Sequence, residues 1–207
     1  MLPNNILIHQ VPTRRKAIAV TFDDGPNLLY TPQVLEIFRS AQAKATFFMI
    51  GCQMELHPEV VKAAHAEGHE IGNHSFTHPF MTELHKLEAR DELVQTDELI
   101  QRLTGVKPKV FRPPYFDQND MVLNLSVSLG YHMIGALNSE ATDWEMPGVS
   151  HIVDKTREQV KPGSILLFHD GFDDRSQTIE AVSILVPELT AQGYELVTVS
   201  ELISSAL

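Results

Sequence analysis

Two adjacent carboxylates, Asp23 and Asp24, stand where the apolar run AVTF meets Gly25 and Pro26. Neighbouring residues on a regular strand point to opposite faces, so two acids that serve one pocket must lie where the strand ends. Gly25 permits unusual backbone angles, and Pro26 cannot continue a central ladder. The stretch therefore predicts a strand end that turns both acids toward one cleft, with an acidic surface turn as the alternative.

His74 and His78 lie four residues apart, a spacing that places two imidazoles on one face of a helical turn. Such a pair is more often structural when it stands alone, but one added carboxylate makes a three-ligand set with open positions, the usual layout of a catalytic zinc site. Asp24 is the natural third ligand, which leaves Asp23 beside the metal as a general base for bound water. The predicted cofactor is a divalent ion, with zinc as the default and cobalt or nickel as alternatives.

His169 closes the apolar run SILLFHD. It is either a structural histidine at a strand end or a general acid, because imidazole titrates near neutrality. Trp144 and Leu167 would form an apolar wall beside it, large enough for a methyl-sized group. Trp144 follows Asp143 in the stretch TDWE, which comes shortly after a predicted strand.

Arg112 precedes two prolines and Tyr115 in the stretch RPPY. The prolines stiffen the turn and fix where the guanidinium group and the Tyr115 backbone N–H point. An arginine near an ionised aspartate favours the charged form of that carboxyl group, and a fixed N–H can stabilise an oxyanion. Taken alone, the stretch is equally consistent with a rigid turn.

Polar residues directly after His169, in the stretch DGFDDRSQTIEA, are expected to border the same cleft through Asp173, Asp174 and Arg175. The single cysteine, Cys52, excludes an internal disulfide and a cysteine-rich zinc site, and it is expected to pack as a small apolar side chain. The other histidines have no partners in this pattern and are assigned structural or surface roles: His9, His57, His65, His69, His85, His132 and His151.

Short β-rich runs alternate with helical patterns along the chain, which indicates right-handed crossovers and a parallel sheet, either open or closed into a barrel. Several runs are apolar on successive residues, as in strands buried on both faces. In either architecture ligands bind at the carboxyl ends of the strands, and the candidate residues fall there. The predicted strands lie within residues 16–24, 44–51, 69–75, 109–115, 131–138, 163–170 and 194–200.

Three helices are predicted between these strands. The first follows Thr31 and Pro32, a cap and proline start, and carries Val34, Leu35 and Phe38 on one stripe. The second runs from about residue 84 to 103, and the third contains Pro187, which is expected to kink or break it. Four glycines stand where helices would end: Gly68, Gly105, Gly130 and Gly193.

Length and composition favour one soluble domain. The 207 residues suffice for a substantial core, and no apolar run is as long as a membrane span. The net charge of -11 and the lack of a basic patch argue against nucleic acid as a partner and favour neutral or cationic substrates. The N-terminal stretch MLPNNILIHQVPTRRK lacks the apolar core of a signal peptide, so the localisation stays open between an intracellular protein and a piece of a longer exported or anchored chain.

These stretches, in this order, resemble the polysaccharide deacetylase family with the NodB homology domain (carbohydrate esterase family four) from about Ala17 to Leu202. TFDDGP and HSFTH together are the specific part, and RPPY, DW and LFH support it by their order. The resemblance implies an α/β fold, a distorted (β/α) barrel with about seven parallel strands in a single domain. It also implies removal of acetyl groups from N-acetylglucosamine-containing glycans of the chitooligosaccharide, chitin or peptidoglycan type.

The resemblance further implies a role for each candidate residue. Asp23 is the base and His169 the acid, Asp24, His74 and His78 bind the metal, Arg112 orients the base, Asp143 tunes His169, Tyr115 offers its backbone N–H, and Trp144 and Leu167 line the acetyl pocket. Two departures, Phe116 where the family commonly has glycine and Glu140 where a second aspartate is common, leave the polymer open. The alternatives are an O-acetyl esterase on xylan, an amidase on a small cyclic amide, and a glycan-binding domain without activity.

Overall fold

A parallel β-sheet forms the centre of the computed structural model, which describes residues 7–207; residues 1–6 of the N-terminal stretch discussed above lie outside the described part. The strand order is β1-β6-β5-β4-β3-β2-β7, β8 adds to β2, and every neighbouring pair is parallel. The strands are β1 Leu7–Ile8, β2 Ala17–Asp23, β3 Thr46–Met49, β4 Glu70–Asn73, β5 Val110–Phe111, β6 His132–Ile134, β7 Ile165–His169 and β8 Glu195–Leu196.

The sheet curls into a distorted half-barrel. Its two end strands, β1 and β7, do not pair with each other as neighbours in the sheet. Instead, the residue pair Gln10 and Ser164 makes an isolated antiparallel bridge between the segments next to them. The expected fold class is thus confirmed, and all seven predicted runs contain a strand. The two-residue strand β1 was not expected, because a run of two residues is too short to show a period in the sequence.

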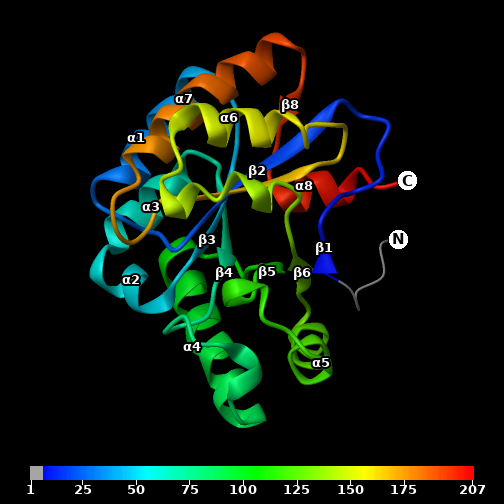
Figure 1. Cartoon of the computed structure of the whole chain (residues 1–207). Helices are drawn as coiled ribbons and strands as arrows, with labels where there is room; N and C mark the ends of the chain where they lie inside the picture. The colour runs from blue at the N-terminus through cyan, green and yellow to red at the C-terminus, as the bar shows by residue number, and fades with distance from the viewer. Residues whose placement is uncertain (1–6) are drawn as a thin grey trace.

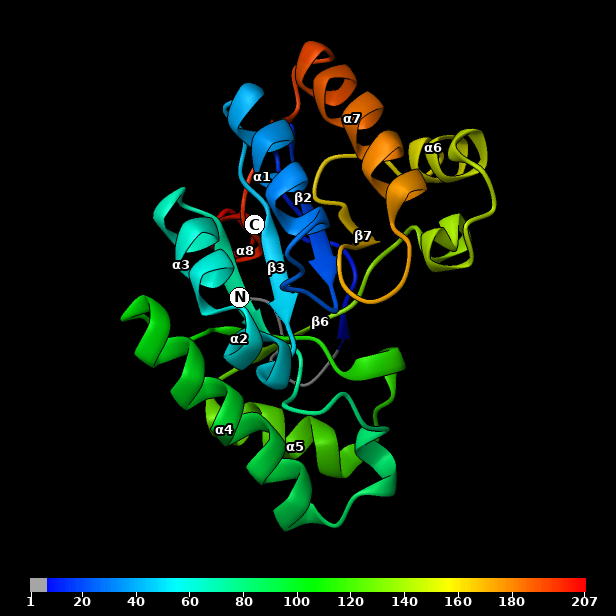
Figure 2. The same ribbon diagram turned by 90° about the vertical axis from the view of Figure 1, so that its left-hand side faces the viewer.

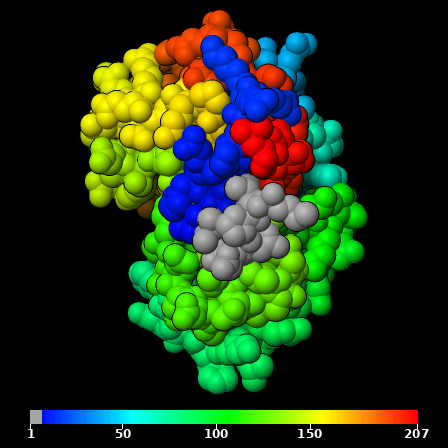
Figure 3. Space-filling view, turned by 90° about the vertical axis from the view of Figure 1, so that its right-hand side faces the viewer, coloured from blue at the N-terminus to red at the C-terminus, as the bar shows by residue number. Residues whose placement is uncertain are grey.

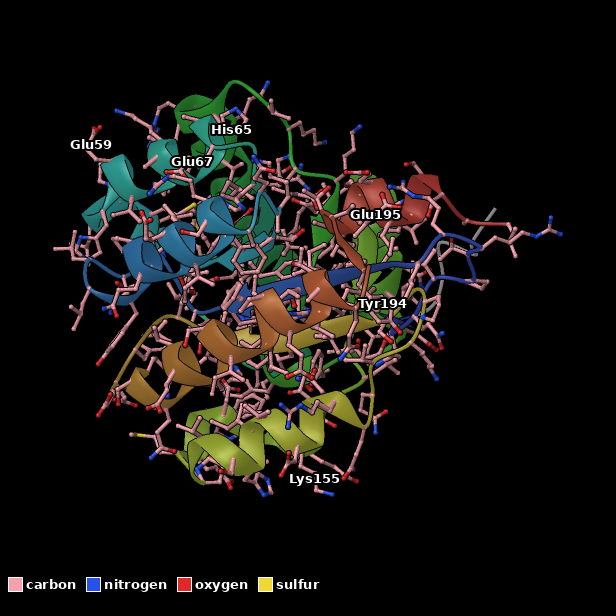
Figure 4. All side chains as sticks on the ribbon, turned by 90° about the horizontal axis from the view of Figure 1, so that it is seen from above. Glu59, His65, Glu67, Lys155, Tyr194 and Glu195 are labelled. Atoms are coloured by element: carbon pink, nitrogen blue, oxygen red, sulfur yellow. The ribbon has the colours of Figure 1, made fainter. Side chains whose placement is uncertain are left out.

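Helices cover the outer face of the sheet (Figures 1 and 2). Seen from above, α3, α1, α7 and α6 follow one another, with Glu59 of α3 and Lys155 of α6 pointing outward at the two sides (Figure 4). Helices α4 and α5 lie together at the other end of the molecule (Figure 1). The helices are α1 Tyr30–Ser40, α2 Gly51–Leu56, α3 Pro58–Ala66, α4 Lys86–Thr104, α5 Asp120–Leu129, α6 Val149–Arg157, α7 Ser176–Ala191 and α8 Val199–Ser204.

The last helix closes the side of the sheet near the N-terminal segment. Figure 3 shows the C-terminal residues (red) lying against the early part of the chain (blue). The Leu207 N–H donates to the Pro12 carbonyl at 3.0 Å, and the Val199 N–H donates to the Thr46 hydroxyl at 2.9 Å. Among residues 7–207, no helix has both the length and the apolar character needed to cross a membrane.

The predicted helix ends are confirmed by backbone geometry. Each of the four glycines adopts a positive φ, between 76° at Gly105 and 86° at Gly130, the left-handed conformation that terminates a helix most easily without a side chain. The expected cap at Thr31 and the expected alternative of a break at Pro187 were wrong. Helix α1 begins before Thr31, whose hydroxyl donates to Asp170 instead of capping the helix. Helix α7 continues through Pro187 to Ala191 without a break.

Aromatic side chains of the sheet and α1 pack together inside the main buried apolar cluster. Phe38 of α1 is fully buried and meets the Phe22 ring edge-on at 5.8 Å.

We expect Phe38→Ala to lower the free energy of unfolding by about 3–5 kcal/mol, because the lost apolar burial adds to the cost of a cavity. Urea unfolding of metal-free protein measures this, and Leu87→Ala, at a position 64% exposed, should change the value by less than about 0.5 kcal/mol. A loss for Phe38→Ala as small as that of the control would contradict this assignment of the core.

Candidate active site

A cleft of about 690 Å³ opens at the carboxyl ends of the central strands. It is lined by residues that follow β2, β4 and β7, as expected for a parallel α/β fold. Arg112 and Asp143 are fully buried behind the cleft wall, with exposed fractions of 0% and 1%. The other predicted site residues all line the cleft: Asp23, Asp24, His74, His78, Tyr115, Trp144, Leu167 and His169.

The two adjacent acids both reach this cleft because the strand ends between them. Asp23 is the last residue of β2, and Asp24 adopts a φ of 72°, in the left-handed region. This conformation turns the second side chain toward the same cleft instead of the opposite face of the sheet. Asp23 also lies in register with His169 on the neighbouring strand β7, so a base and an acid would stand side by side.

Asp24, His74 and His78 make a three-ligand cluster. Asp24 Oδ1 lies 3.1 Å from Nε2 of His78 and 3.4 Å from Nε2 of His74, and one ligand atom from each residue fits within 4.8 Å. Asp24 Oδ1 is buried and has no hydrogen-bond partner among residues 7–207. Because a buried carboxylate oxygen without a partner is costly, the donor set fits a divalent cation.

The second ring nitrogen of each histidine is already engaged. Nδ1 of His74 lies 2.7 Å from the carbonyl oxygen of Arg112, which fixes this nitrogen as the donor. Nδ1 of His78 lies 3.2 Å from the Tyr115 hydroxyl. Both Nε2 atoms are thereby left to face Asp24. Burial alone would raise the pKa of Asp24, but the two neighbouring imidazoles outweigh burial and hold the pKa of this carboxyl group below its usual range.

The histidine pair does not lie on a helix, so the helical spacing expected from the sequence does not explain why the two imidazoles converge. Residues 74–80 form an irregular loop after β4. Ser75 and His78 adopt φ values of 64° and 62°, in the left-handed region that bends the chain back on itself. The imidazoles meet through this bend, so the four-residue spacing led to the right pair for the wrong structural reason.

Arg112 holds Asp23 from behind. Its Nη1 donates to Asp23 Oδ1 at 2.7 Å and to the Thr21 hydroxyl at 2.8 Å. Two backbone carbonyls accept from the rest of the guanidinium group, at Ile134 and Gly135. An arginine with this many partners is rigid, so it holds the Asp23 carboxyl group in a fixed position.

Asp143 holds His169 in the same way. Its Oδ1 lies 2.9 Å from Nδ1 of His169, and its Oδ2 accepts from the His169 backbone N–H at 2.8 Å and from the Thr178 hydroxyl at 2.9 Å. Burial alone would lower the pKa of His169, but the Asp143 carboxylate outweighs it and raises the pKa of the imidazole to about 9. The contact with Asp143 therefore favours the protonated form of His169.

The apolar wall has the expected members. Leu167 is buried, and the half-exposed Trp144 ring meets His169 edge-on at 5.3 Å. Across the cleft, Tyr115 stacks on Phe80 with ring centroids 4.1 Å apart. Phe116 also lines the cleft, and its φ of 53° lies in the region where glycine is most at ease.

The polar segment after His169 only partly borders the cleft. Asp173 and Arg175 line it. Asp174 does not, which corrects the expectation for this residue: its Oδ1 accepts from the Tyr30 hydroxyl at 3.0 Å and from the Ser176 N–H at 2.8 Å. Glu140 is exposed and faces Lys155 of α6 at 3.8 Å.

The histidines assigned to structural or surface roles have such roles wherever their contacts are defined. His69 is buried and accepts the Ala45 N–H, His9 bonds the Ala136 carbonyl, and His85 caps α4. Cys52 is partly buried, and burial raises the pKa of its thiol, as for a packed cysteine.

Two residues next to the site were assigned no role from the sequence. Asp170 is fully buried, and its backbone N–H donates to the Asp23 carbonyl at 3.2 Å. Glu92 of α4 accepts hydrogen bonds from the loop that carries the two histidines. Asp170 directly follows His169 in the chain, but its contact with Asp23 is visible only in the structure, and Glu92 reaches the site because folding brings helix α4 to the histidine loop.

Comparison with known proteins agrees with this geometry. The family model described as polysaccharide deacetylase matches residues 10–134. A peptidoglycan-N-acetylglucosamine deacetylase from Bacillus cereus is 40% identical over 202 residues, which cover 97% of this chain and 94% of that protein. A chitooligosaccharide deacetylase from Bradyrhizobium sp. is 34% identical, with 87% and 88% of the two chains covered.

A solved structure shows the same fold at comparable coverage. The crystal structure of the Bc1960 peptidoglycan N-acetylglucosamine deacetylase superposes with a TM-score of 0.90 at 29% identity, covering 95% of this chain and 92% of that chain. The similarity therefore includes the strands and loops that form the cleft, and not only the motifs.

Proposed function

The chain belongs to the polysaccharide deacetylase family, and from that premise we propose that it removes the acetyl group from N-acetylglucosamine residues of a glycan of the chitooligosaccharide, chitin or peptidoglycan type. The two relatives named above are deacetylases of N-acetylglucosamine-containing peptidoglycan and of chitooligosaccharides. One observation carries the proposal: the Asp24, His74 and His78 cluster lies in the same cleft as a second carboxylate, Asp23, and the imidazole of His169. That set provides for metal binding and for both proton transfers of amide hydrolysis.

Asp24, His74 and His78 are the residues that would hold the divalent ion. When bound there, such an ion supplies Lewis acidity, which lowers the pKa of a water molecule and polarises a carbonyl group. Zinc is the ion that this donor set favours first, and cobalt and nickel are compatible with the same ligands.

Asp23 is proposed to take the proton of the attacking water at a carboxylate oxygen. It lies beside the metal ligands, with Oδ2 3.7 Å from Nε2 of His74, but its other oxygen is held by Arg112. The contact with Arg112 fixes the Asp23 carboxylate so that its free oxygen faces the cleft, where a base would act.

His169 is proposed to give its proton to the leaving nitrogen. An amine leaves as a neutral molecule only after it is protonated, so the acid must carry a proton before the bond breaks. The contact with Asp143 favours that protonated state. An ester needs this proton less than an amide does, because an alcohol is a better leaving group than an amine. A protonated histidine at this position therefore favours an amide as the substrate.

The rest of the cleft is proposed to position the acetyl group. Trp144 and Leu167 form an apolar wall for the methyl group beside His169. The Tyr115 backbone N–H is proposed to donate to the carbonyl oxygen as it becomes negatively charged, and one such donor is worth about 3 kcal/mol.

Acetate release from a panel of acetylated glycans tests the proposal. We expect release from chitooligosaccharides or peptidoglycan fragments, loss of release when a chelator removes the ion, and recovery when zinc, cobalt or nickel is added back. Acetylxylan should be a poorer substrate. Release from acetylxylan alone would establish the O-acetyl esterase instead, and glycan binding that persists with chelator and without any release would establish a binding domain.

A further inference from the structure

The loop that carries the two metal-binding histidines has no regular secondary structure to hold it. In a helix, its backbone N–H groups would donate to carbonyl oxygens four residues back. Here side chains accept them instead. The N–H of Ser75 donates to Asn73 Oδ1 at 2.8 Å, those of Phe76 and Thr77 donate to Glu92 Oε2 at 2.7 Å each, and that of His78 donates to Ser75 Oγ at 3.1 Å.

Glu92 takes the largest share of these bonds. One oxygen accepts the two successive N–H groups, and the other accepts the Thr77 hydroxyl at 2.7 Å. Hydrogen bonds to an ionised carboxylate are shorter and about twice as strong as neutral ones. The carboxylate comes from the middle of α4, so the loop is held by a separate and rigid element.

The loop needs such a restraint because its backbone is strained. Ser75 and His78 both have positive φ values, and each residue in that region costs on the order of 1–3 kcal/mol unless its surroundings hold it. Phe76 and Thr77, which Glu92 binds, lie between the two strained residues. The carbonyl groups of Ser75 and Phe76 also accept the N–H groups of Gly51 and Cys52, so the loss of Glu92 would free the part of the segment next to His78, at Thr77.

Glu92 is not needed to dock α4, because other residues of this helix attach it to the sheet. The Leu93 side chain and that of Ala89 are fully buried, and the Leu93 carbonyl accepts from Asn73 Nδ2 at 2.9 Å. The Asp97 carboxylate lies in a further buried contact with the Tyr131 hydroxyl. Helix α4 is therefore attached to the sheet independently of Glu92.

We propose that Glu92 is a positioning residue for the metal centre: it holds the segment between His74 and His78 in the ligating geometry before the ion arrives. The inference rests on the metal site of the proposed function but not on the identity of the glycan. Its consequence is that Glu92 sets the affinity for the ion, although it touches neither the ion nor the substrate. Partners that orient metal ligands in this way typically contribute about 10–100-fold to metal affinity.

The test compares Glu92→Ala and Glu92→Gln with Glu98→Ala, a control at an exposed position on the same helix. The zinc dissociation constant of each metal-free protein is measured by competition with a chromogenic chelator. We expect Glu92→Ala to weaken zinc binding about 10–100-fold. Glu92→Gln should lie between that variant and the native protein, because its amide keeps one oxygen for the backbone N–H groups. Glu98→Ala, which removes the same charge, should bind zinc like the native protein.

Two further measurements separate positioning from general destabilisation. The thermal midpoint of metal-free Glu92→Gln should stay close to the native value, and kcat at saturating zinc should be retained while activity at limiting zinc falls. Native zinc affinity in both Glu92 variants would overturn the proposal, as would an equal loss in the Glu98 control. Because zinc binding is measured without substrate, failure to find a deacetylated glycan would leave this result intact.

Discussion

Asp23→Asn should lower kcat for N-deacetylation about 10²–10⁴-fold, the usual contribution of a general base, while the protein keeps its bound metal. The structure separates the two neighbouring acids: Asp24 faces both histidines, whereas Asp23 is paired with Arg112. An amide at position 23 cannot take a proton from water. Its carbonyl oxygen can still accept the hydrogen bond from Arg112, which limits the cost of leaving that buried charge without its partner.

Activity and metal content must be measured on the same preparations of this variant. Elemental analysis should give native stoichiometry for Asp23→Asn and reduced zinc for Asp24→Asn. Asp174→Asn is the matched control, because Asp174 is exposed and lies outside the cleft. Loss of metal from Asp23→Asn would show that Asp23 also binds the metal and that the roles assigned to the two acids are wrong. Native activity of Asp23→Asn would exclude Asp23 as the base.

His169→Ala should lower the rate on an N-acetyl glycan by about 10²–10⁴-fold and the rate on an activated acetyl ester by much less. The reason is the leaving group: an amine must be protonated as it departs, whereas an activated phenolate leaves without help. The buried contact with Asp143 keeps His169 in the protonated form that this step uses. The measurement is kcat/KM for both substrates, at one pH and with saturating zinc.

The test compares the loss of kcat/KM on the amide with the loss of kcat/KM on the ester. A loss of rate on the amide alone would support the role of His169 as the acid. His151→Ala is the control and should alter neither rate, because His151 lies on the surface, where its Nε2 bonds the Glu140 carbonyl. Equal losses on amide and ester would contradict the acid role. They would instead indicate that His169 orients the acetyl group, together with the adjacent Trp144.

Local signals explain why much of the fold was predictable. The apolar run that ends in Asp23 is fully buried along β2, and Gly105 and Gly130 end helices where their conformational freedom is needed. Such signals depend on neighbours in the chain, so a sequence reveals them. Thr31 and Pro187 were misjudged because tertiary contacts outweighed local preference: a buried partner, Asp170, took the hydroxyl, and the packed face of α7 carried the helix past its proline.

The candidate site divides in the same way. The residue types and their order determined the metal ligands, the base and the acid as predictions, because ligand chemistry belongs to side chains and parallel strands bring their carboxyl ends to one edge. Only the tertiary structure decided how those groups are held. The family resemblance indicated that Arg112 orients Asp23, but the geometry of this contact spans 89 positions, and the contact of Glu92 with Phe76, which was not predicted, spans 16. The chemistry of a side chain depends on its residue type, whereas its orientation depends on chain segments that meet only in the folded protein.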